Sequence, residues 1–273
     1  MNLTSPSQVK AWCIENGFHP NKTLGQNFLI DQNALKAIVD SGLEKVKVEG
    51  EVSVLEIGPG MGVLTEELLR RGCRVTAIEK DPVLAARLEK ESKTEGWSKL
   101  ALITGDALDF ISSSASSLRL SSFDCMVSNL PYQAGTRILL ELVQARTIPV
   151  ITALVQTEVA DRLAAAEGSK TRGLAGVWAQ LDYDVRIVRK VSASCFWPRP
   201  EIGSSVVQLI RHERNIGLSD EERDLFHSLT KKAFEHRRKQ LGSIFKDLIQ
   251  STARAEELSN EDWLILTKGL MQK

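Results

Sequence analysis

Cysteine and histidine are scarce in this chain of 273 residues, and neither is clustered. The four cysteines, Cys13, Cys73, Cys125 and Cys195, stand apart from one another, and no two form a Cys-x-x-Cys pair. A disulfide framework and a zinc site both need ligands at characteristic spacings, so the sequence argues against both. We expect reduced thiols and no bound metal.

Long apolar runs and an excess of one charge are also missing. No apolar stretch reaches the roughly 20 residues of a membrane-spanning helix, and the first residues lack the basic start and apolar core of a signal peptide. Thirty-five basic residues balance thirty-five acidic ones, which argues against a general polyanion binder. We expect a cytoplasmic protein with no membrane contact, in which local basic patches would carry any contact with nucleic acid.

The pattern from residue 51 onward is typical of an α/β fold. Short β-rich runs alternate with helical patterns, which predicts a parallel sheet covered by helices. Two later runs, residues 185–191 and 205–210, have no clear helix between them, so we expect them to pair as an antiparallel edge. The five expected parallel strands are residues 52–57, 74–79, 100–104, 123–128 and 150–155.

Helix signals precede and follow this pattern. Ser5 and Gln8 have the spacing of a capping box, and Gly17 is a stop signal for the helix that follows. A second helix is expected at residues 32–41, ending at Gly42. After residue 210 the pattern is helical only, with two further capping boxes, Ser219 with Glu222 and Ser259 with Asp262.

These patterns divide the chain into two expected domains. We expect residues 1–210 to form the larger domain, in which residues 1–33 supply an N-terminal helix and a loop. Residues 211–273 form a small all-helical C-terminal domain. The serine-rich segment at residues 111–117 is expected to be a solvated loop.

The segment Asn129-Leu130-Pro131-Tyr132, directly after the expected strand at residues 123–128, suits an amino-bearing planar substrate. The Asn129 amide oxygen and the Leu130 carbonyl can accept both hydrogens of an exocyclic amine and direct its lone pair outward. Pro131 fixes φ and keeps that carbonyl free of a competing bond, and Tyr132 offers a face for stacking. An ordinary turn with a core tyrosine is the alternative interpretation.

Three earlier strand ends carry residues suited to a nucleoside cofactor. Gly58, Gly60 and Gly62 form a Gly-x-Gly-x-Gly segment after the first strand, where a ligand can approach the backbone. Glu79, about twenty residues later, is placed to form hydrogen bonds with both hydroxyls of a ribose. Asp106 can accept a hydrogen bond from an adenine amine. This order is the one that S-adenosylmethionine requires, and it differs from the Gly-x-Gly-x-x-Gly of dinucleotide enzymes.

With these residues in place, the chain resembles the ribosomal RNA adenine dimethyltransferases (the KsgA and Dim family) almost from end to end. The resemblance implies that residues 1–210 are a catalytic domain with a Rossmann-like class I S-adenosylmethionine-dependent methyltransferase sheet, and that residues 1–33 include a cofactor and substrate loop. It also implies that the small helical domain, residues 211–273, contacts RNA or the ribosome. The resemblance is carried by the blocks Gly25-Gln26-Asn27-Phe28-Leu29, Leu55-Glu56-Ile57-Gly58-Pro59-Gly60, Gly105-Asp106-Ala107, Asn129-Leu130-Pro131-Tyr132, Gln156-Thr157-Glu158-Val159-Ala160 and Phe196-Trp197-Pro198-Arg199-Pro200 leading to Ser204.

The family's activity would be dimethylation of two adjacent adenosines near the 3′ end of small-subunit ribosomal RNA, within the 30S particle. Phe196 would stack on the target adenine opposite Tyr132, with Asn129, Leu130 and Pro131 completing the catalytic set. Glu158 would lie near the site, or be an ordinary surface charge. The implied cofactor contacts are Asn27, Leu29, Gly58, Gly60, Glu79, Asp106, Ala107 and Asn129.

Some positions differ from the family pattern. Gln133-Ala134-Gly135 stands where Asn-Ile-Ser is common, and Gly242 stands where a polar or basic residue often occurs. These changes concern RNA contacts rather than methyl transfer. A basic cluster could bind phosphate, or could be a solvated helix face; it consists of Lys231, Lys232, Arg237, Arg238 and Lys239.

The implied partners are small-subunit ribosomal RNA and the 30S precursor, and the free protein is expected to be a monomer. One alternative is a non-catalytic RNA-binding ribosome assembly factor, or a transcription factor, on the same fold. Another keeps the enzyme but changes the substrate to glutamine side chains or DNA adenine, which use related Asn- or Asp-Pro-Pro-Tyr turns. Leu130 in place of the first proline, together with the Phe196 block, favours ribosomal RNA.

Overall fold

The chain folds into two compact units. A computed structural model describes residues 1–111 and 119–272, so most of the predicted serine-rich loop lies outside the described residues. The first unit comprises Met1–Ala160 and Arg186–Ile210, and the second comprises Asp161–Val185 and Arg211–Lys273. The chain passes between units at residues 210 and 211, where the sequence placed its domain boundary, but Asp161–Val185 also joins the second unit.

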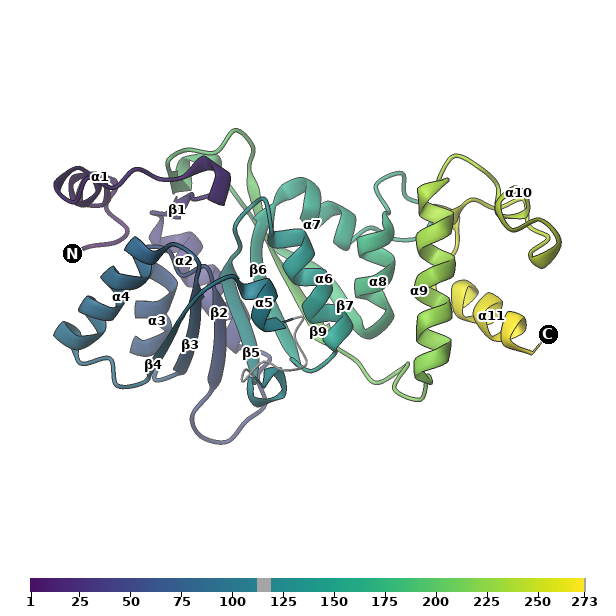
Figure 1. The fold of residues 1–273 in the computed structure, drawn as a ribbon, viewed down its shortest axis with the longest axis horizontal. Helices are drawn as coiled ribbons and strands as arrows, with labels where there is room; N and C mark the ends of the chain where they lie inside the picture. The colour runs from purple at the N-terminus through teal and green to yellow at the C-terminus, as the bar shows by residue number, and fades with distance from the viewer. Residues whose placement is uncertain (112–118, 273) are drawn as a thin grey trace. The chain divides into compact units, whose positions relative to one another are not determined.

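A seven-stranded sheet forms the centre of the first unit (Figure 1). The strand order is β4-β3-β2-β5-β6-β9-β7, with β2 to β6 parallel and β9 antiparallel to β6. All seven predicted strands are present within two residues of their expected bounds, and the last two are neighbours. The strands are β2 (Ser53–Ile57), β3 (Arg74–Glu79), β4 (Leu100–Thr104), β5 (Cys125–Asn129), β6 (Val150–Gln156), β7 (Tyr183–Val191) and β9 (Ser204–Arg211).

Helices cover both faces of this sheet. α2 contacts β5 and β6 and also packs against α3, whereas α5 and α6 contact each other in front of the sheet (Figure 1). Apolar residues of α2, α3 and the strands form one core, which includes Ile38, Leu68 and Val127. The helices are α1 (Pro6–Glu15), α2 (Gln32–Leu43), α3 (Val63–Arg70), α4 (Pro82–Glu95), α5 (Ala107–Ile111), α6 (Gly135–Ala145) and α7 (Thr157–Leu163).

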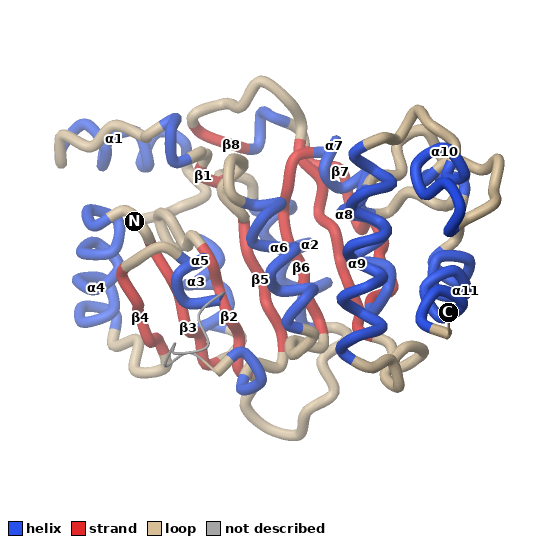
Figure 2. The backbone as a smooth tube through the Cα atoms, turned by 45° about the vertical axis from the view of Figure 1, so that its right-hand side comes forward, coloured by secondary structure: helices blue, strands red, loops and turns tan. Residues whose placement is uncertain are grey.

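The N-terminal segment is ordered against the sheet by a second, two-stranded sheet. β1 (Phe28–Leu29) pairs antiparallel with β8 (Phe196–Trp197), two segments far apart in sequence (Figure 2). The capping box predicted for α1 is wrong, because Ser5 makes no side-chain cap hydrogen bond. Gln8 instead accepts a hydrogen bond from the Asn2 backbone at 2.7 Å.

The predicted end of α2 at Gly42 is also wrong, because the helix continues to Leu43. Gly42 is buried, and a Cβ there would lie 2.5 Å from Cγ2 of Val127 on β5. The glycine is therefore used for close packing of the helix on the sheet and not as a stop signal. Asp31 caps the helix start by accepting a hydrogen bond from Ala34 N at 2.7 Å.

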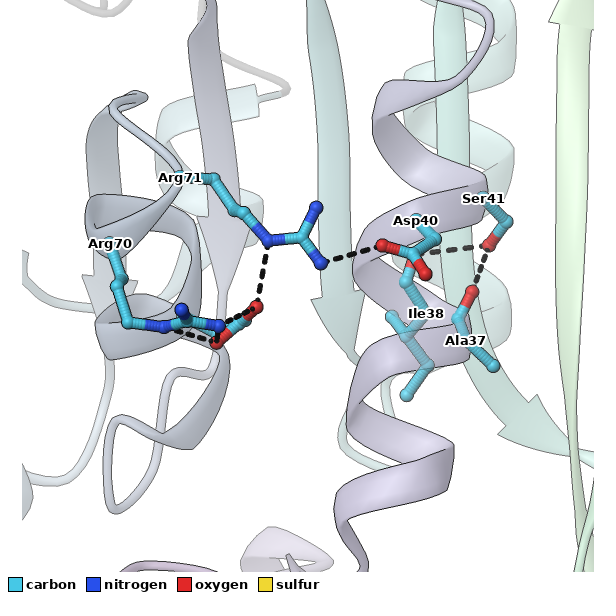
Figure 3. Close-up of polar contacts among 7 residues, drawn as sticks. Ala37, Ile38, Asp40, Ser41, Arg70 and Arg71 are labelled. Atoms are coloured by element: carbon cyan, nitrogen blue, oxygen red, sulfur yellow. Dashed lines mark hydrogen bonds and ion pairs between the residues drawn. The ribbon is translucent and has the colours of Figure 1, made fainter.

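An ion-pair network joins α2 to α3 on one face of the sheet. Arg71, directly after α3, contacts Glu67 at 2.9 Å and Asp40 of α2 at 2.6 Å. Figure 3 shows the Arg71 guanidinium reaching Asp40 across the space between the two helices. Arg70 binds the same Glu67 carboxylate at 2.6 Å but makes no contact with α2 in the described structure.

The second unit is mainly helical. Both capping boxes predicted here are confirmed: Ser219 with Glu222 begins α9, and Ser259 with Asp262 begins α11. Trp263 is fully buried in a core with residues of all the helices. These helices are α8 (Leu174–Asp182), α9 (Asp220–Glu235), α10 (Leu241–Phe245) and α11 (Asn260–Met271). Among the described residues, no helix of the protein has the length and apolarity to span a bilayer.

Candidate active site

A cavity of about 390 Å³ lies in the first unit, at the carboxyl ends of β2, β3, β4 and β5. This is the edge where open α/β sheets bind ligands, because the loops after parallel strands converge there. Every sequence-predicted cofactor and catalytic residue except Phe196 lines it. These residues are Asn27, Leu29, Gly58, Gly60, Glu79, Asp106, Ala107, Asn129, Leu130, Pro131 and Tyr132.

The glycine segment after β2 is held by Glu79, at the end of β3. Glu79 is 6% exposed, and its carboxylate accepts hydrogen bonds from the backbones of Gly60 at 2.9 Å and Asp81 at 2.8 Å. Burial raises the pKa of Glu79, and the two backbone donors oppose that rise. Gly58 and Gly60 have φ values of +67° and +58°, which favour glycine. A Cβ at Gly60 would lie 3.3 Å from the Phe28 ring, so the cavity wall is close-packed there.

Asp106 follows β4 and is paired with Lys80. The Lys80 ammonium lies 2.7 Å from Oδ2 of Asp106, while Oδ1 accepts a hydrogen bond from Leu108 N at 3.0 Å. The hydrogen bond from Lys80 is the main cause of the lowered pKa of Asp106. The carboxylate is therefore ionised at neutral pH, and each of its oxygens retains a lone pair for a ligand.

Asn129 ends β5 with its amide in a defined orientation. Its Nδ2 donates a hydrogen bond to the Asn27 carbonyl at 3.1 Å, so the nitrogen side of the amide faces the N-terminal segment. Among the described residues no partner is recorded for Oδ1, and no backbone N–H donates to the Leu130 carbonyl. Two acceptor oxygens on adjacent residues of the cavity wall are thus available to a ligand.

Tyr132 is fixed at both its backbone and its hydroxyl. The hydroxyl lies 2.5 Å from Ser204 Oγ on β9, and burial raises the pKa of this tyrosine. On the backbone side, a Cβ at Gly25 would lie 3.0 Å from Tyr132 N, and Gly25 has φ +65°. Only a glycine lets the N-terminal segment approach the Asn129 turn so closely.

Phe196 does not line the cavity. It pairs with Leu29 in the two-stranded sheet, is 2% exposed, and belongs to the main core. The phenylalanine at the cavity wall is Phe28, whose ring lies 6.4 Å from that of Trp197. Glu158, in the first turn of α7, is exposed and also lies outside the cavity lining. Their proposed roles remain predictions.

The predicted basic cluster lies in the second unit, around the end of α9. Lys231, Lys232, Arg238 and Lys239 are exposed. Arg237 is used within the unit, because its guanidinium donates to the Lys170 carbonyl at 2.5 Å and lies 3.4 Å from Glu256.

The sequence analysis assigned no site role to three polar residues of the cavity wall. Gln26 donates a hydrogen bond to Asp81 at 2.7 Å, which ties the N-terminal segment to the start of α4. Lys80 pairs with Asp106, and Arg137 lies in the first turn of α6. Lys80 could have been found from its position next to Glu79, whereas Gln26 and Arg137 required the folded chain. No cluster of metal-binding side chains occurs in the part of the chain that the structure describes.

The sheet order, the glycine segment after β2 and the acids after β3 and β4 define a class I S-adenosylmethionine-dependent methyltransferase fold. The family model for ribosomal RNA adenine dimethylases matches residues 17–268. The chain belongs to that family.

Curated relatives agree with this assignment. The ribosomal RNA small subunit methyltransferase A of Deinococcus radiodurans is 43% identical over 211 residues, covering 76% of this chain and 67% of the relative. The protein of the same name from Chlamydia abortus is 36% identical over 261 residues, covering 95% of this chain and 90% of the relative.

Two crystal structures share the fold. A dimethyladenosine transferase from Plasmodium falciparum has a TM-score of 0.75 at 24% identity, covering 89% of this chain and 97% of that one. The 23S rRNA methyltransferase ErmE has a TM-score of 0.67 at 24% identity, covering 90% and 100%.

Proposed function

We propose that this protein uses S-adenosylmethionine to dimethylate the exocyclic nitrogens of two adjacent adenosines in the 3′-terminal hairpin of small-subunit ribosomal RNA. The observation that carries the proposal is the orientation of Asn129. Because Nδ2 is held by the Asn27 carbonyl, Oδ1 is the atom presented to a ligand. An adenine amine could donate one hydrogen to Oδ1 and the other to the Leu130 carbonyl.

The residues present suit the cofactor. A cavity of about 390 Å³ falls in the usual range for small-molecule sites. Glu79 would accept hydrogen bonds from ribose hydroxyls, and the ionised Asp106 would accept one from the adenine amine of the cofactor. Asn27, Leu29, Gly58, Gly60 and Ala107 would complete its binding site, with Asn129 serving both ligands. The cofactor supplies a methyl group on a positively charged sulfur.

The contribution of the protein to the reaction is mainly positional. Asn129 and Leu130 would withdraw the amine lone pair from conjugation and aim it at the methyl carbon, and Tyr132 would support the ring. Alignment of this kind can supply up to about 7–11 kcal/mol of a barrier. The target adenine must leave its stack to enter the cavity. Since an amine already carries its lone pair, no base has to act before transfer. The methylated nitrogen is then positively charged and would release its proton to water.

The partner that this function requires is the 30S precursor. Lys231, Lys232, Arg238 and Lys239 are exposed on the second unit and would contact RNA phosphates there. Arg237 is better explained as a structural residue, given its contacts with Lys170 and Glu256. We propose that the free protein is a cytoplasmic monomer.

The direct test is incubation of wild-type protein with a labelled methyl donor and undermethylated small subunits, followed by nucleoside analysis. Wild-type protein should form dimethyladenosine. Asn129→Ala should reduce the rate by about 100-fold or more, because loss of one preorganised polar contact to a reacting group costs that much. A matched control is Asn33→Ala, because Asn33 is an exposed asparagine of α2 outside the cavity lining. Full activity of Asn129→Ala would refute the proposed role.

Calorimetry separates the enzyme from a non-catalytic RNA-binding factor on the same fold. The enzyme should bind S-adenosylhomocysteine, and Asp106→Ala should weaken that binding. A folded wild-type protein with no measurable affinity for the cofactor or its product would instead favour the binding factor.

A further inference from the structure

Arg137 lines the cavity and makes no hydrogen bond or ion pair with the residues that the structure describes. Two of the side chains lining the cavity are cations, Lys80 and Arg137. Lys80 is paired with Asp106 at 2.7 Å. For Arg137, which is exposed, neither a hydrogen bond nor an ion pair is recorded with any described residue. A charged side chain held at a cavity wall without a protein partner is available to an anionic ligand.

Arg137 is rigidly linked to Asn129. The turn between them is closed by hydrogen bonds from Ala134 N and Gly135 N to the Pro131 carbonyl, at 3.2 Å and 2.8 Å. Arg137 then lies in the first turn of α6. It is therefore placed by the same segment that presents the two acceptor oxygens, and not by the glycine segment after β2.

The charge of Arg137 also reaches Asp106, where it contributes to the lowered pKa of that carboxyl. If Asp106 binds the cofactor adenine and Glu79 the ribose, the amino-acid end of the cofactor extends away from Asp106. The cofactor carboxylate is then a poor match for Arg137. The other anion that the proposed reaction brings to the cavity is the RNA backbone.

We propose that Arg137 binds a phosphodiester oxygen next to the target adenosine and so positions the extruded nucleotide. The inference rests on the proposed function and names the group that holds its substrate. A guanidinium suits this task because its planar fork can donate two hydrogen bonds to one phosphate. Arg137 is a substrate-positioning residue, and it takes no part in methyl transfer itself.

The test compares Arg137→Gln with Arg146→Gln, which removes the same charge just after the last residue of α6 and outside the cavity lining. With undermethylated small subunits, Arg137→Gln should raise KM about 10-fold or more, the effect of losing a hydrogen bond to a charged group. Its kcat should change less than twofold. Arg137→Lys should recover part of the loss, because it restores the charge without the fork.

Salt dependence and cofactor binding complete the test. The slope of log KM against log salt concentration should fall by about 0.7 in Arg137→Gln, the value for one phosphate contact on a single strand, and stay unchanged in Arg146→Gln. An unchanged KM and slope would overturn the inference. The inference would also be overturned if Arg137→Gln weakened the binding of S-adenosylhomocysteine but not that of methylthioadenosine, which lacks the amino-acid carboxylate. That result would assign Arg137 to the cofactor carboxylate. Failure of the wild-type protein to form dimethyladenosine would instead refute the proposed function.

Discussion

At the scale of single residues, Glu56 gives the first unit a specific pH dependence. Glu56 lies in β2 and is only 1% exposed. Its carboxyl group accepts a hydrogen bond from the Thr65 hydroxyl at 2.7 Å. Its second carboxyl oxygen has no hydrogen-bond partner in the part of the chain that the structure describes. Burial raises the pKa of Glu56 to about 8. The neutral acid is therefore the form that the fold accommodates.

This raised pKa predicts that stability falls with increasing pH. The folded state keeps the proton of Glu56 up to about pH 8, whereas the unfolded state releases it near the ordinary value of 4.5. Between these two values the folded state binds more protons, so the free energy of unfolding decreases as pH rises. Glu56→Gln should flatten this decrease in thermal unfolding scans between pH 5 and pH 8. An identical pH profile in the two proteins would contradict the assignment.

The residue types of the site were readable from the sequence, but their partners were not. Glu79, Asp106 and Asn129 each follow a strand, and the carboxyl ends of parallel strands converge, so their proximity followed from strand order. The orientation of the Asn129 amide depends on Asn27, which precedes it by 102 residues. Phe196 was expected beside the substrate because of the family motif; its pairing with Leu29 and its burial depend on a partner strand far away in the sequence, and its role stays a prediction.

At the scale of helices and strands, replacement of glycine by alanine should have opposite effects on stability at two helical positions, Gly42 and Gly269. Alanine has the higher helix propensity, by about 1 kcal/mol. Gly42→Ala should nevertheless destabilise the first unit by about 1–3 kcal/mol, because the new Cβ would clash with Val127. Gly269→Ala, in α11, should stabilise the second unit by up to about 1 kcal/mol, because no described atom outside the local backbone would lie within 4 Å of the new Cβ. Denaturant unfolding of both variants checks the pair, and a stabilising Gly42→Ala would contradict the packing.

The last residue of α3, Arg70, and the residue that follows it, Arg71, form a second matched pair. Arg71 bridges Glu67 to Asp40 on α2, whereas Arg70 binds Glu67 alone and is two-thirds exposed. Arg71→Ala should cost about 1–2 kcal/mol, since it breaks a network around a nearly buried carboxylate. Arg70→Ala should cost about 0.5 kcal/mol or less. Equal losses of unfolding free energy would show that the bridge between the helices contributes nothing.

Element positions were predictable where one local signal dominated. The strands followed from β-rich runs, and the capping boxes at Ser219 and Ser259 have both reciprocal hydrogen bonds. The same spacing at Ser5 failed, because Gln8 reaches back to Asn2. The prediction that Gly42 ends α2 was wrong, because a glycine can also occur inside a helix where the helix packs closely against a strand. That use is determined by the partner element, which the local sequence does not contain.

At the scale of the whole molecule, the two units carry different parts of the proposed function. The first unit contains the cavity and all its lining residues. The second unit carries exposed Lys231, Lys232, Arg238 and Lys239. The sequence placed the start of a helical domain at residue 211, but it gave no signal that residues 161–185 pack with that domain. Their helix, α8, shares a core with α9 and α11, a tertiary contact that periodicity does not encode.

The central claim is that the cavity beside Asn129 transfers methyl groups to adenines of small-subunit ribosomal RNA. The most direct measurement is the location and number of methyl groups that the purified protein adds to undermethylated 30S particles. The account predicts two methyl groups on the exocyclic nitrogen of each of two adjacent adenosines near the 3′ end. Methylation at other sites, on other atoms, or none at all with folded, cofactor-bound protein would contradict it.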